Sequence, residues 1–383
     1  MKSICVVAHF AYGAMSGGDR GHIGGVEGQT SLMSRWLSSR GYRVSLLTWD
    51  EGQPQKTMID GVEIIKMCRR EDGLPGIRFF YPRWASLNRA MDLANAELYY
   101  QNCAEYVTGQ VALWCRRHGR RFVYSVASDP DCDPRLPEMH TLRERILYRY
   151  GLKYADRVIV QTRRQKEMLK IGFGRDSVIL PMPCSGPQRG EYHPPEPRGR
   201  DHGRVLWVGR IHRVKRPDLM MEIAGALPEV AFDVVGPPDA DEGYLKNVSG
   251  RASRLPNMTF HGAVSRDRMP EFYQKASLLC CTSSYEGFPN AFLEAWSFGL
   301  PIVSTVDPDG LIQDLKLGMV GTEVRDIVTT IQKLLASPDL WREMSANARK
   351  YYVENHSVDS AMSRFERLFL EVLNPHSKPE RKD

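Results

Sequence analysis

The feature that most constrains the fold is an alternation of short apolar runs with amphipathic stretches, which starts twice along the chain. In the first half, the strand-like runs are residues 4–10, 44–49, 62–67, 121–126, 157–162 and 178–183. In the second half, they are residues 205–208, 232–235, 258–260, 278–282 and 302–305. Helical patterns lie between them, including a long one over residues 87–118 that we expect to break near Gly109. Strands that alternate with helices predict parallel sheets covered on both faces.

A segment rich in proline, glycine and charged residues separates the two series. Residues 185–204 have this composition, which is typical of a linker. A chain of 383 residues also exceeds the usual size of one hydrophobic core. We therefore expect two doubly wound, Rossmann-like α/β domains, at residues 1–184 and 205–355, that face each other across a cleft. A helix at 356–374 and a frayed polar tail at 375–383 complete the prediction.

Two glycine-containing loops at expected strand ends carry groups that suit phosphate. In doubly wound sheets, ligands bind at the carboxyl ends of the strands. Gly209 follows one strand, and Arg210 and Lys215 precede a helix expected to begin at Pro217. An arginine fork and a mobile ammonium beside a helix N-terminus suit a diphosphate, although basic residues are also common on surface loops. Gly25 opens the first helix, where a plain glycine-rich turn would have the same composition.

The segment Glu-Gly-Phe-Pro-Asn-Ala-Phe-Leu-Glu, from Glu286 to Glu294, is the most specific motif. We expect a helix to begin at Pro289, with Glu286 before it and Glu294 inside it. At the helical rise the two acids are at most ~12 Å apart, about the reach from a hexose to a ribose across a diphosphate. Carboxylates accept hydrogen bonds from sugar hydroxyls, and the backbone N–H groups from Gly287 to Asn290 would offset their repulsion of phosphate. Glu294 has apolar neighbours in sequence, so its carboxylate should need a partner.

The Gly25 loop, the Gly209–Lys215 loop and the Glu286–Glu294 segment follow one another along the two expected domains. Together they resemble the retaining family-4 nucleotide-sugar glycosyltransferases of GT-B fold, and the resemblance covers nearly the whole chain. It implies an enzyme that transfers a hexosyl unit from a nucleoside-diphosphate sugar to a hydroxyl of a glycan or lipid-linked acceptor. It also implies retention of anomeric configuration, no metal and no cofactor. The last helix would cross back to the first domain.

The resemblance also implies roles for individual residues. Arg210 and Lys215 would bind the donor diphosphate and stabilise the leaving group, and Glu286 would contact the transferred sugar. Glu294 would hold the ribose hydroxyls. The remaining donor-binding positions would be Gly25 on the phosphates, Val264 at the base, and the backbone of Gly287, Phe288, Pro289 and Asn290 at sugar and phosphate.

Asp129, Asp131 and Asp133 follow the strand at 121–126, where many members of the resembled family have a histidine that points at the reaction centre. Asp129 is therefore a candidate for orienting the acceptor or taking its proton, and it joins Glu286, Lys215 and Arg210 as a candidate catalytic residue. Acids at alternate positions could also hold a metal. Turn formation by the Asp-Pro pairs is a third interpretation.

Composition narrows the range of partners. Residues 1–190 contain 28 Lys and Arg against 19 Asp and Glu, which suits an anionic membrane surface or a phosphate-bearing acceptor and equally suits ordinary solvated surface. There is no aromatic-interleaved basic motif, so we expect no nucleic-acid partner. The eight cysteines lack zinc-ligand spacing. No apolar run has the length of a signal or membrane segment, so we expect a cytoplasmic protein, and peripheral contact with the inner face of the cell membrane stays open.

The aromatic and basic segment at 79–84 has two interpretations, core packing of a loop or contact with an acceptor or a membrane surface. For the whole chain, we expect a glycosyltransferase of bacterial polysaccharide biosynthesis. Two alternatives remain at this point: a nucleotide-sugar epimerase on the same scaffold, and a non-catalytic nucleotide-sugar binding protein.

Overall fold

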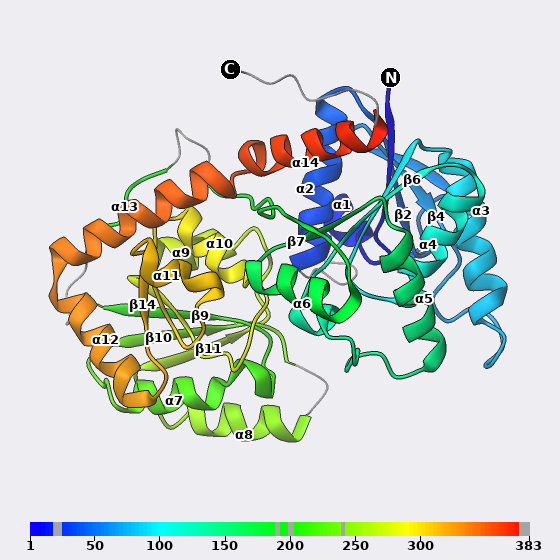
Figure 1. Ribbon diagram of the computed structural model, residues 1–383. Helices are drawn as coiled ribbons and strands as arrows, with labels where there is room; N and C mark the ends of the chain where they lie inside the picture. The colour runs from blue at the N-terminus through cyan, green and yellow to red at the C-terminus, as the bar shows by residue number, and fades with distance from the viewer. Residues whose placement is uncertain (18–24, 188–191, 198–202, 239–241, 375–383) are drawn as a thin grey trace, which may run out of the picture. The chain divides into compact units, whose positions relative to one another are not determined.

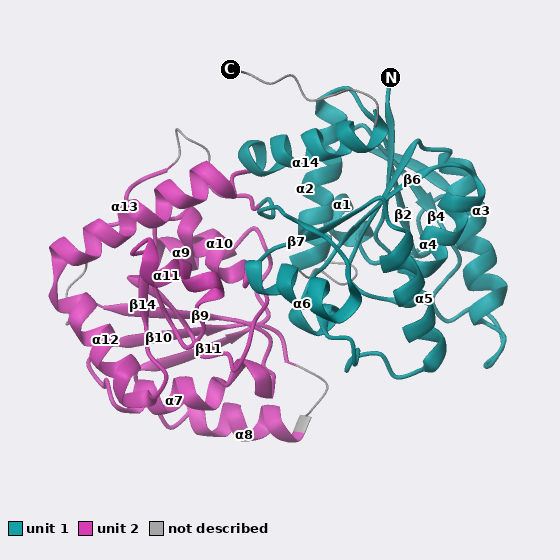
Figure 2. Ribbon diagram, viewed as in Figure 1, with its two compact units in different colours: residues 1–183, 358–383 teal, residues 184–357 magenta. Residues whose placement is uncertain are grey.

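The chain folds into two compact units, which are described separately. The computed structural model describes residues 1–17, 25–187, 192–197, 203–238 and 242–374 (Figure 1). Unit 1 contains residues 1–183 and 358–383, and unit 2 contains residues 184–357 (Figure 2). Most of the expected linker is thus part of unit 2 or outside the described residues, and the expected frayed tail at 375–383 lies outside them.

Unit 1 is built on an eight-stranded sheet in the order β3-β4-β2-β1-β5-β6-β7-β8. Seven strands pair in parallel, and β3 runs antiparallel to β4 at one edge. The strands are β1 (Ser3–Val7), β2 (Arg43–Thr48), β3 (Lys56–Ile59), β4 (Val62–Lys66), β5 (Leu98–Asn102), β6 (Arg121–Ser125), β7 (Arg157–Val160) and β8 (Val178–Ile179). Strands β1, β2 and β5 are buried almost throughout because helices cover both faces of the sheet. For β1 and β2 this agrees with the apolar runs in the sequence.

The helices of unit 1 include the last helix of the chain. They are α1 (Tyr12–Ser16), α2 (Gly25–Ser39), α3 (Ala85–Ala94), α4 (Tyr106–Arg117), α5 (Leu142–Tyr154), α6 (Arg163–Phe173) and α14 (Val358–Leu373). Helix α14 is fastened to α2 by the hydrogen bond from Trp36 Nε1 to Asp359 Oδ1, at 2.7 Å. Its inner face, which includes Phe365 and Phe369, packs on Tyr100 of β5. The second half of the sequence therefore supplies one covering layer of the first sheet.

The prediction of one long helical stretch over residues 87–118 was wrong. Helix α3 ends at Asn95, which takes the left-handed conformation with φ of 40°, and a strand, β5, follows. Strand β5 lies in the middle of the sheet between β1 and β6. Its sequence, Leu-Tyr-Tyr-Gln-Asn, has helix-like neighbours on both sides, and only the tertiary pairing of its backbone with two strands makes it extended.

Gly109 is also not a helix break. It lies inside α4, where an added Cβ atom would come within 2.1 Å of the carbonyl oxygen of Leu147 in α5. Gly151 of α5 makes the reciprocal contact, since its Cβ would lie 2.6 Å from the carbonyl oxygen of Thr108. Helices α4 and α5 thus pack backbone to backbone through two glycines.

We expect Gly109→Ala to destabilise unit 1 by about 2 kcal/mol or more, because a methyl group has no room against a backbone carbonyl. The midpoint of urea unfolding, followed by circular dichroism, measures this loss. Arg117→Ala, at an exposed position of the same helix, is the matched control and should change stability by less than about 0.5 kcal/mol. Equal midpoints for the two variants would contradict the close packing.

Unit 2 has a six-stranded, fully parallel sheet in the order β11-β10-β9-β12-β13-β14. The strands are β9 (Arg204–Val208), β10 (Ala231–Val235), β11 (Met258–Gly262), β12 (Leu278–Cys281), β13 (Ile302–Ser304) and β14 (Gly318–Val320). The helices are α7 (Pro217–Gly225), α8 (Glu242–Ala252), α9 (Met269–Lys275), α10 (Asn290–Ser297), α11 (Leu311–Asp314), α12 (Val324–Ala336) and α13 (Pro338–Asn355). The predicted class, two doubly wound α/β units, is confirmed.

Candidate functional site

The strand order of unit 2 reverses between β9 and β12, which are neighbours in the middle of the sheet. From β9 the chain continues outward through β10 and β11, and from β12 it continues the other way through β13 and β14. At such a reversal the two loops that leave the carboxyl ends of the central strands diverge and leave room for a ligand. These are the loops that contain Arg210 and Lys215 on one side and Glu286 on the other.

The loop after β9 approaches the neighbouring strand closely. A Cβ atom on Gly236, which follows β10 and has φ of 153°, would lie 1.8 Å from the carbonyl oxygen of Gly209. Residues Arg213–Lys215 then form one turn of 3₁₀ helix, with the Val214 amide donating to Nδ1 of His212 at 3.1 Å. Helix α7 begins at Pro217, as the sequence predicts. This turn places Lys215 at the N-terminal side of α7.

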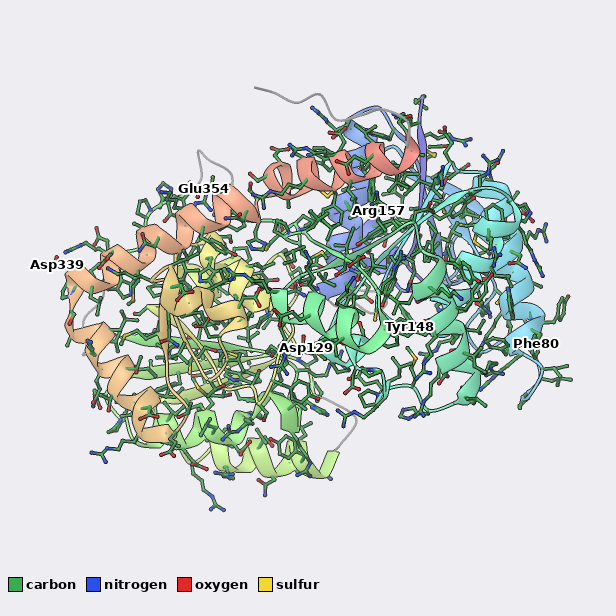
Figure 3. The ribbon with its side chains drawn as sticks, viewed as in Figure 1. Phe80, Asp129, Tyr148, Arg157, Asp339 and Glu354 are labelled. Atoms are coloured by element: carbon green, nitrogen blue, oxygen red, sulfur yellow. The ribbon has the colours of Figure 1, made fainter. Side chains whose placement is uncertain are left out.

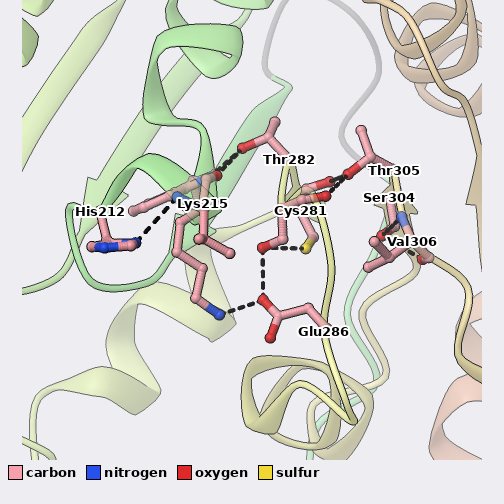
Figure 4. A network of polar contacts seen from close by, with 11 residues as sticks. His212, Lys215, Cys281, Thr282, Glu286, Ser304, Thr305 and Val306 are labelled. Carbon is pink, nitrogen blue, oxygen red and sulfur yellow. Dashed lines mark hydrogen bonds and ion pairs between the residues drawn. The ribbon is translucent and has the colours of Figure 1, made fainter. Parts of the chain in front are cut away.

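Buried hydroxyl and amide groups join the two loops to each other. Thr282, directly after β12, accepts a hydrogen bond from the indole nitrogen of Trp207 in β9 at 2.9 Å. Its own hydroxyl donates to the carbonyl oxygen of Lys215 at 2.7 Å. The Ser284 amide donates to the carbonyl of Val214 at 2.8 Å. The backbone beneath Lys215 is therefore fixed by the strand that carries the other loop (Figure 4).

Lys215 and Glu286 meet between the loops. The ammonium group of Lys215 contacts Oε1 of Glu286, and the Ser283 hydroxyl donates to the same oxygen at 2.6 Å (Figure 4). The Glu286 side chain is 15% exposed and the Lys215 side chain 31% exposed. Lys215 and Glu286, which the sequence predicts to share one site, are thus in direct contact. Ser283 hydrogen-bonds the same carboxylate oxygen.

Cys281 lies beside this group but is not set up as a nucleophile. Its sulfur is 3.5 Å from the hydroxyl of Ser283. Burial raises the pKa of the Cys281 thiol, and the nearby Glu286 carboxylate raises it further. The thiol therefore stays protonated at neutral pH, and a protonated thiol is a poor nucleophile.

The helix after Glu286 begins one residue later than expected. Helix α10 starts at Asn290, and Pro289 is its N-cap with an extended ψ of 124°. Proline has no N–H, so Pro289 contributes only its carbonyl, which accepts from the amide of Phe292 at 3.0 Å. Among the described residues, the amides of Gly287 and Phe288 donate to no other protein group. Those two N–H groups beside the helix N-terminus are suited to an anion.

Glu294 has the partner that its apolar neighbours require. It lies on α10, and the hydroxyl of Tyr273 on α9 donates to its Oε2 at 2.6 Å. Tyr273 is 2% exposed, and burial followed by the Glu294 charge raises its pKa well above the usual value. The tyrosine therefore remains a hydrogen-bond donor and fixes the orientation of the carboxylate.

Arg210 and Val264 lie at the same edge of the sheet without joining the Lys215–Glu286 pair. Arg210 is exposed directly after β9. Val264 is half-buried in the loop between β11 and α9, two strands away from β9. Their assignments to the diphosphate and the base stay predictions, as does that of the backbone from Gly287 to Asn290.

Two candidate residues, Gly25 and Asp129, belong to unit 1. Helix α2 begins at Gly25, while Gly24 lies outside the described residues. Asp129 opens a 3₁₀ turn after β6, at the position labelled in Figure 3. Its Oδ1 accepts from Nε2 of Gln165 at 3.1 Å, and its Oδ2 is 3.2 Å from Nε of Arg164. Helix α6 thus fixes the Asp129 carboxylate, and its part in the reaction stays a prediction.

The three aspartates do not converge on a metal site. Asp131 turns inward and accepts from the amides of Ala127 and Ser128 at 3.0 and 3.1 Å, while burial raises its pKa to about 6. Asp133 pairs with Arg135, whose hydrogen bonds lower the Asp133 pKa to about 2. Within the described residues no group of acidic, histidine or cysteine side chains could hold a metal ion. Asp131 and Asp133 therefore serve the turn.

Two family models match the chain, one in each half. The model described as Glycosyl transferase 4-like domain matches residues 24–181, and the model described as Glycosyl transferases group 1 matches residues 188–351. Together they span most of the sequence. The chain belongs to the group 1 glycosyltransferases. The two motifs of the second half, at residues 209–217 and 286–294, are the ones that unit 2 brings to the reversal of its strand order.

Curated relatives and solved structures agree with this family. The chain is similar to the D-inositol 3-phosphate glycosyltransferase of Gordonia bronchialis, with 27% identity over 242 residues, which are 56% of this chain and 52% of the relative. The protein of the same name from Mycolicibacterium smegmatis is 26% identical over 184 residues, 46% of this chain and 42% of the relative. The chain thus spans about half the length of the curated relatives it matches.

The similarity of structure covers the whole fold. Sucrose-phosphate synthase from Thermosynechococcus elongatus matches with a TM-score of 0.79 and 17% identity, over 98% of this chain and all of that one. Anabaena HepE in complex with UDP and glucose matches with a TM-score of 0.74 and 15% identity, over 97% of this chain and all of that one. These likenesses show the GT-B fold. No helix in the described parts of the glycosyltransferase is long and apolar enough to cross a bilayer.

If Glu294 binds a nucleotide sugar, as the sequence predicts, we expect Tyr273→Phe to raise the KM for that donor by about three- to ten-fold with little change in kcat. The reason is that the hydrogen bond that orients Glu294 is lost while the aromatic ring keeps its packing. Steady-state kinetics over a range of donor concentrations measure the effect. Tyr244→Phe, which removes a tyrosine hydroxyl bonded to Asp218 in the same unit, is the matched control. If both variants keep the wild-type KM, Glu294 is not oriented for the donor.

Proposed function

We propose that this glycosyltransferase moves a hexosyl unit from a nucleoside-diphosphate sugar to a hydroxyl of a glycan or lipid-linked acceptor, with retention at the anomeric carbon and without a metal. The observation that carries the proposal is the contact between Lys215 and Glu286 at the strand reversal of unit 2. One loop thereby offers a cation for phosphate and the other an acceptor for sugar hydroxyls. Anabaena HepE, a structural neighbour, was solved with UDP and with UDP-glucose, so a uridine donor is the first to test.

The pair of charges explains how the site is ready for a donor. Without a diphosphate, the Lys215 ammonium and the Glu286 carboxylate offset each other's desolvation. An incoming diphosphate carries more negative charge and draws the lysine, whose long side chain can move while its backbone is held by Thr282. Glu286 remains hydrogen-bonded to Ser283, so the carboxylate stays in place to accept a hydroxyl of the sugar.

Transfer then depends on stabilising the charge of the leaving group. As the bond between the anomeric carbon and the phosphate oxygen breaks, negative charge grows on the nucleoside diphosphate. In this proposal Lys215, Arg210 and the amides of Gly287 and Phe288 stabilise that charge, because preorganised donors of this kind are a large source of catalysis. The acceptor hydroxyl forms the new bond from the same face. Its proton passes to a base, for which Asp129 is the candidate.

The wider role that we propose is cytoplasmic synthesis of a bacterial polysaccharide, with the enzyme in peripheral contact with a membrane. A glycosyltransferase involved in lipopolysaccharide biosynthesis, WaaG, is among the structural neighbours, with a TM-score of 0.66 and 18% identity. The excess of basic residues in the first half of the chain agrees with an anionic surface nearby.

We expect Glu286→Gln and Lys215→Met each to lower transfer by about 10²–10³-fold, since each removes a charged group from the reacting part of the donor. Both replacements keep the approximate size of the side chain, so the fold should survive. The assay incubates radiolabelled UDP-, GDP- and dTDP-sugars with lipid and glycan acceptors and separates the products by chromatography.

Lys275→Met is the matched control, because this lysine is also in unit 2 but is exposed on α9 and pairs only loosely with Glu271 at 3.9 Å. It should keep wild-type activity. Full transfer by Glu286→Gln or Lys215→Met would overturn the proposed site. A sugar epimerised without any acceptor, or donor binding with no turnover on any acceptor, would overturn the proposed reaction.

A further inference from the structure

A short turn-rich segment of unit 1, residues 69–84, holds one aromatic residue inside the protein and turns others outward. Phe79 is the inner residue: it is 5% exposed and packs edge-on against Tyr106 and Trp84, with ring centres 5.2 and 5.6 Å apart. The segment folds back on itself so closely that a Cβ atom on Gly73 would lie 2.5 Å from Cδ of Pro82. Its outward side chains are therefore carried by an anchored backbone.

Four large apolar side chains of this segment are exposed to solvent. They are Leu74, Ile77, Phe80 and Tyr81, and between 57% and 73% of each is exposed. Figure 3 labels Phe80 at the outer edge of unit 1. Single exposed apolar residues are common on protein surfaces, but four within eight residues of sequence form a patch, and such patches indicate an interaction site.

The first turns of helix α5 extend the same patch. The guanidinium carbon of Arg143 lies 3.7 Å from the ring centre of Phe79, so the start of α5 is next to the segment. Leu142 and Ile146 are four residues apart on this helix and thus on one face of it, and both are more than half exposed. We call the six exposed side chains the apolar face: Leu74, Ile77, Phe80, Tyr81, Leu142 and Ile146.

The two segments that contain the apolar face have an excess of positive charge. Residues 69–83 and 142–149 contain seven arginines and three acidic residues. Two of the acids are engaged in local backbone contacts, since Asp72 accepts from the amide of Arg69 and Glu144 caps the first turn of α5. Arg78 and Arg143 are exposed, and in sequence they adjoin Ile77 and Leu142 of the apolar face. Arginine can bind phosphate through two parallel hydrogen bonds.

We propose that the apolar face seats this enzyme on a bilayer that contains anionic phospholipids. The aromatic and aliphatic side chains enter the boundary between head groups and acyl chains, and the arginines of the two segments pair with lipid phosphates. Arginine and aromatic residues also occur at protein interfaces, so salt-dependent binding to anionic vesicles is the observation that distinguishes a bilayer from a protein partner. The proposal rests on the proposed function for its purpose, which is to bring the enzyme to a lipid-linked acceptor, whereas the binding itself needs neither donor nor acceptor.

The test is co-sedimentation of the full chain with vesicles of phosphatidylcholine alone or mixed with phosphatidylglycerol. We expect binding to the mixed vesicles, weaker binding to neutral vesicles, and a decline with added salt. The double variant Phe80→Ser, Tyr81→Ser should bind the mixed vesicles at least about ten-fold more weakly, since both side chains are more than half exposed. Phe80 also contacts the rings of Phe79 and Trp84, so circular dichroism of the variant must first show the wild-type fold. Arg78→Gln should weaken binding and reduce its dependence on salt.

Ile171→Ser is the matched control, because Ile171 is an exposed apolar residue of unit 1 that lies on α6, outside the apolar face. It should bind vesicles as the wild type does. No binding to the mixed vesicles, or equal binding by the double variant, would overturn the proposal. So would loss of vesicle binding together with a dimer that light scattering detects in the wild type and not in the double variant, since the face would then serve a second copy of the chain.

The outcome is separable from that of the proposed function. Transfer to a soluble acceptor should be unchanged in the double variant, because the apolar face contains no residue of the donor loops. Vesicle binding without transfer by the wild type would leave this inference standing and remove the proposed function. Transfer without vesicle binding would do the reverse.

Discussion

The side-by-side pairing of β9 and β12 is the constraint on which the candidate site depends. This pairing brings together the carboxyl ends of two strands that lie some seventy residues apart in sequence. In its register, Leu278 is opposite Val205. The buried hydroxyl of Thr282 then joins the loops by bonding to Trp207 and to the backbone of Lys215. Without these hydrogen bonds, the two loops would be independent surface segments. The distance between the Lys215 ammonium and the Glu286 carboxylate would then not be fixed.

As a consequence, the backbone at Lys215 is fixed while its side chain can move. The backbone of the β9 loop is immobilised, whereas the Lys215 ammonium sits at the end of a flexible stem that can exchange one anionic partner for another. In Glu286, by contrast, the side chain itself is held, because the Ser283 hydroxyl donates to its carboxylate. A site with one mobile cation and one fixed acceptor can bind a diphosphate without losing the orientation of the sugar next to it. This is how the structure connects its fold to the proposed chemistry.

The sequence predicts the positions of the two loops at the strand reversal well, because charged residues beside glycine and proline are conspicuous where strands end. It does not reveal Thr282, Ser283 or Tyr273, since a single hydroxyl in a loop or helix has no periodic signal, and its value comes from partners that only the fold supplies. Strand β5 was missed for a related reason: its residues continue a helical pattern on both sides. The contact of Gly109 with α5 likewise depends on two helices that meet in space.

The proposed chemistry requires that Lys215 binds the diphosphate and that Glu286 restrains it until the donor arrives. Calorimetric titration with UDP, which has the diphosphate but lacks the sugar, is the most direct test. We expect Lys215→Met to bind UDP at least about ten-fold more weakly than the wild type. We expect Glu286→Gln to bind UDP as tightly as the wild type or more tightly, because the lysine no longer has to leave a carboxylate. Unchanged affinity in Lys215→Met, or weaker binding in Glu286→Gln, would rule out these roles for the two residues.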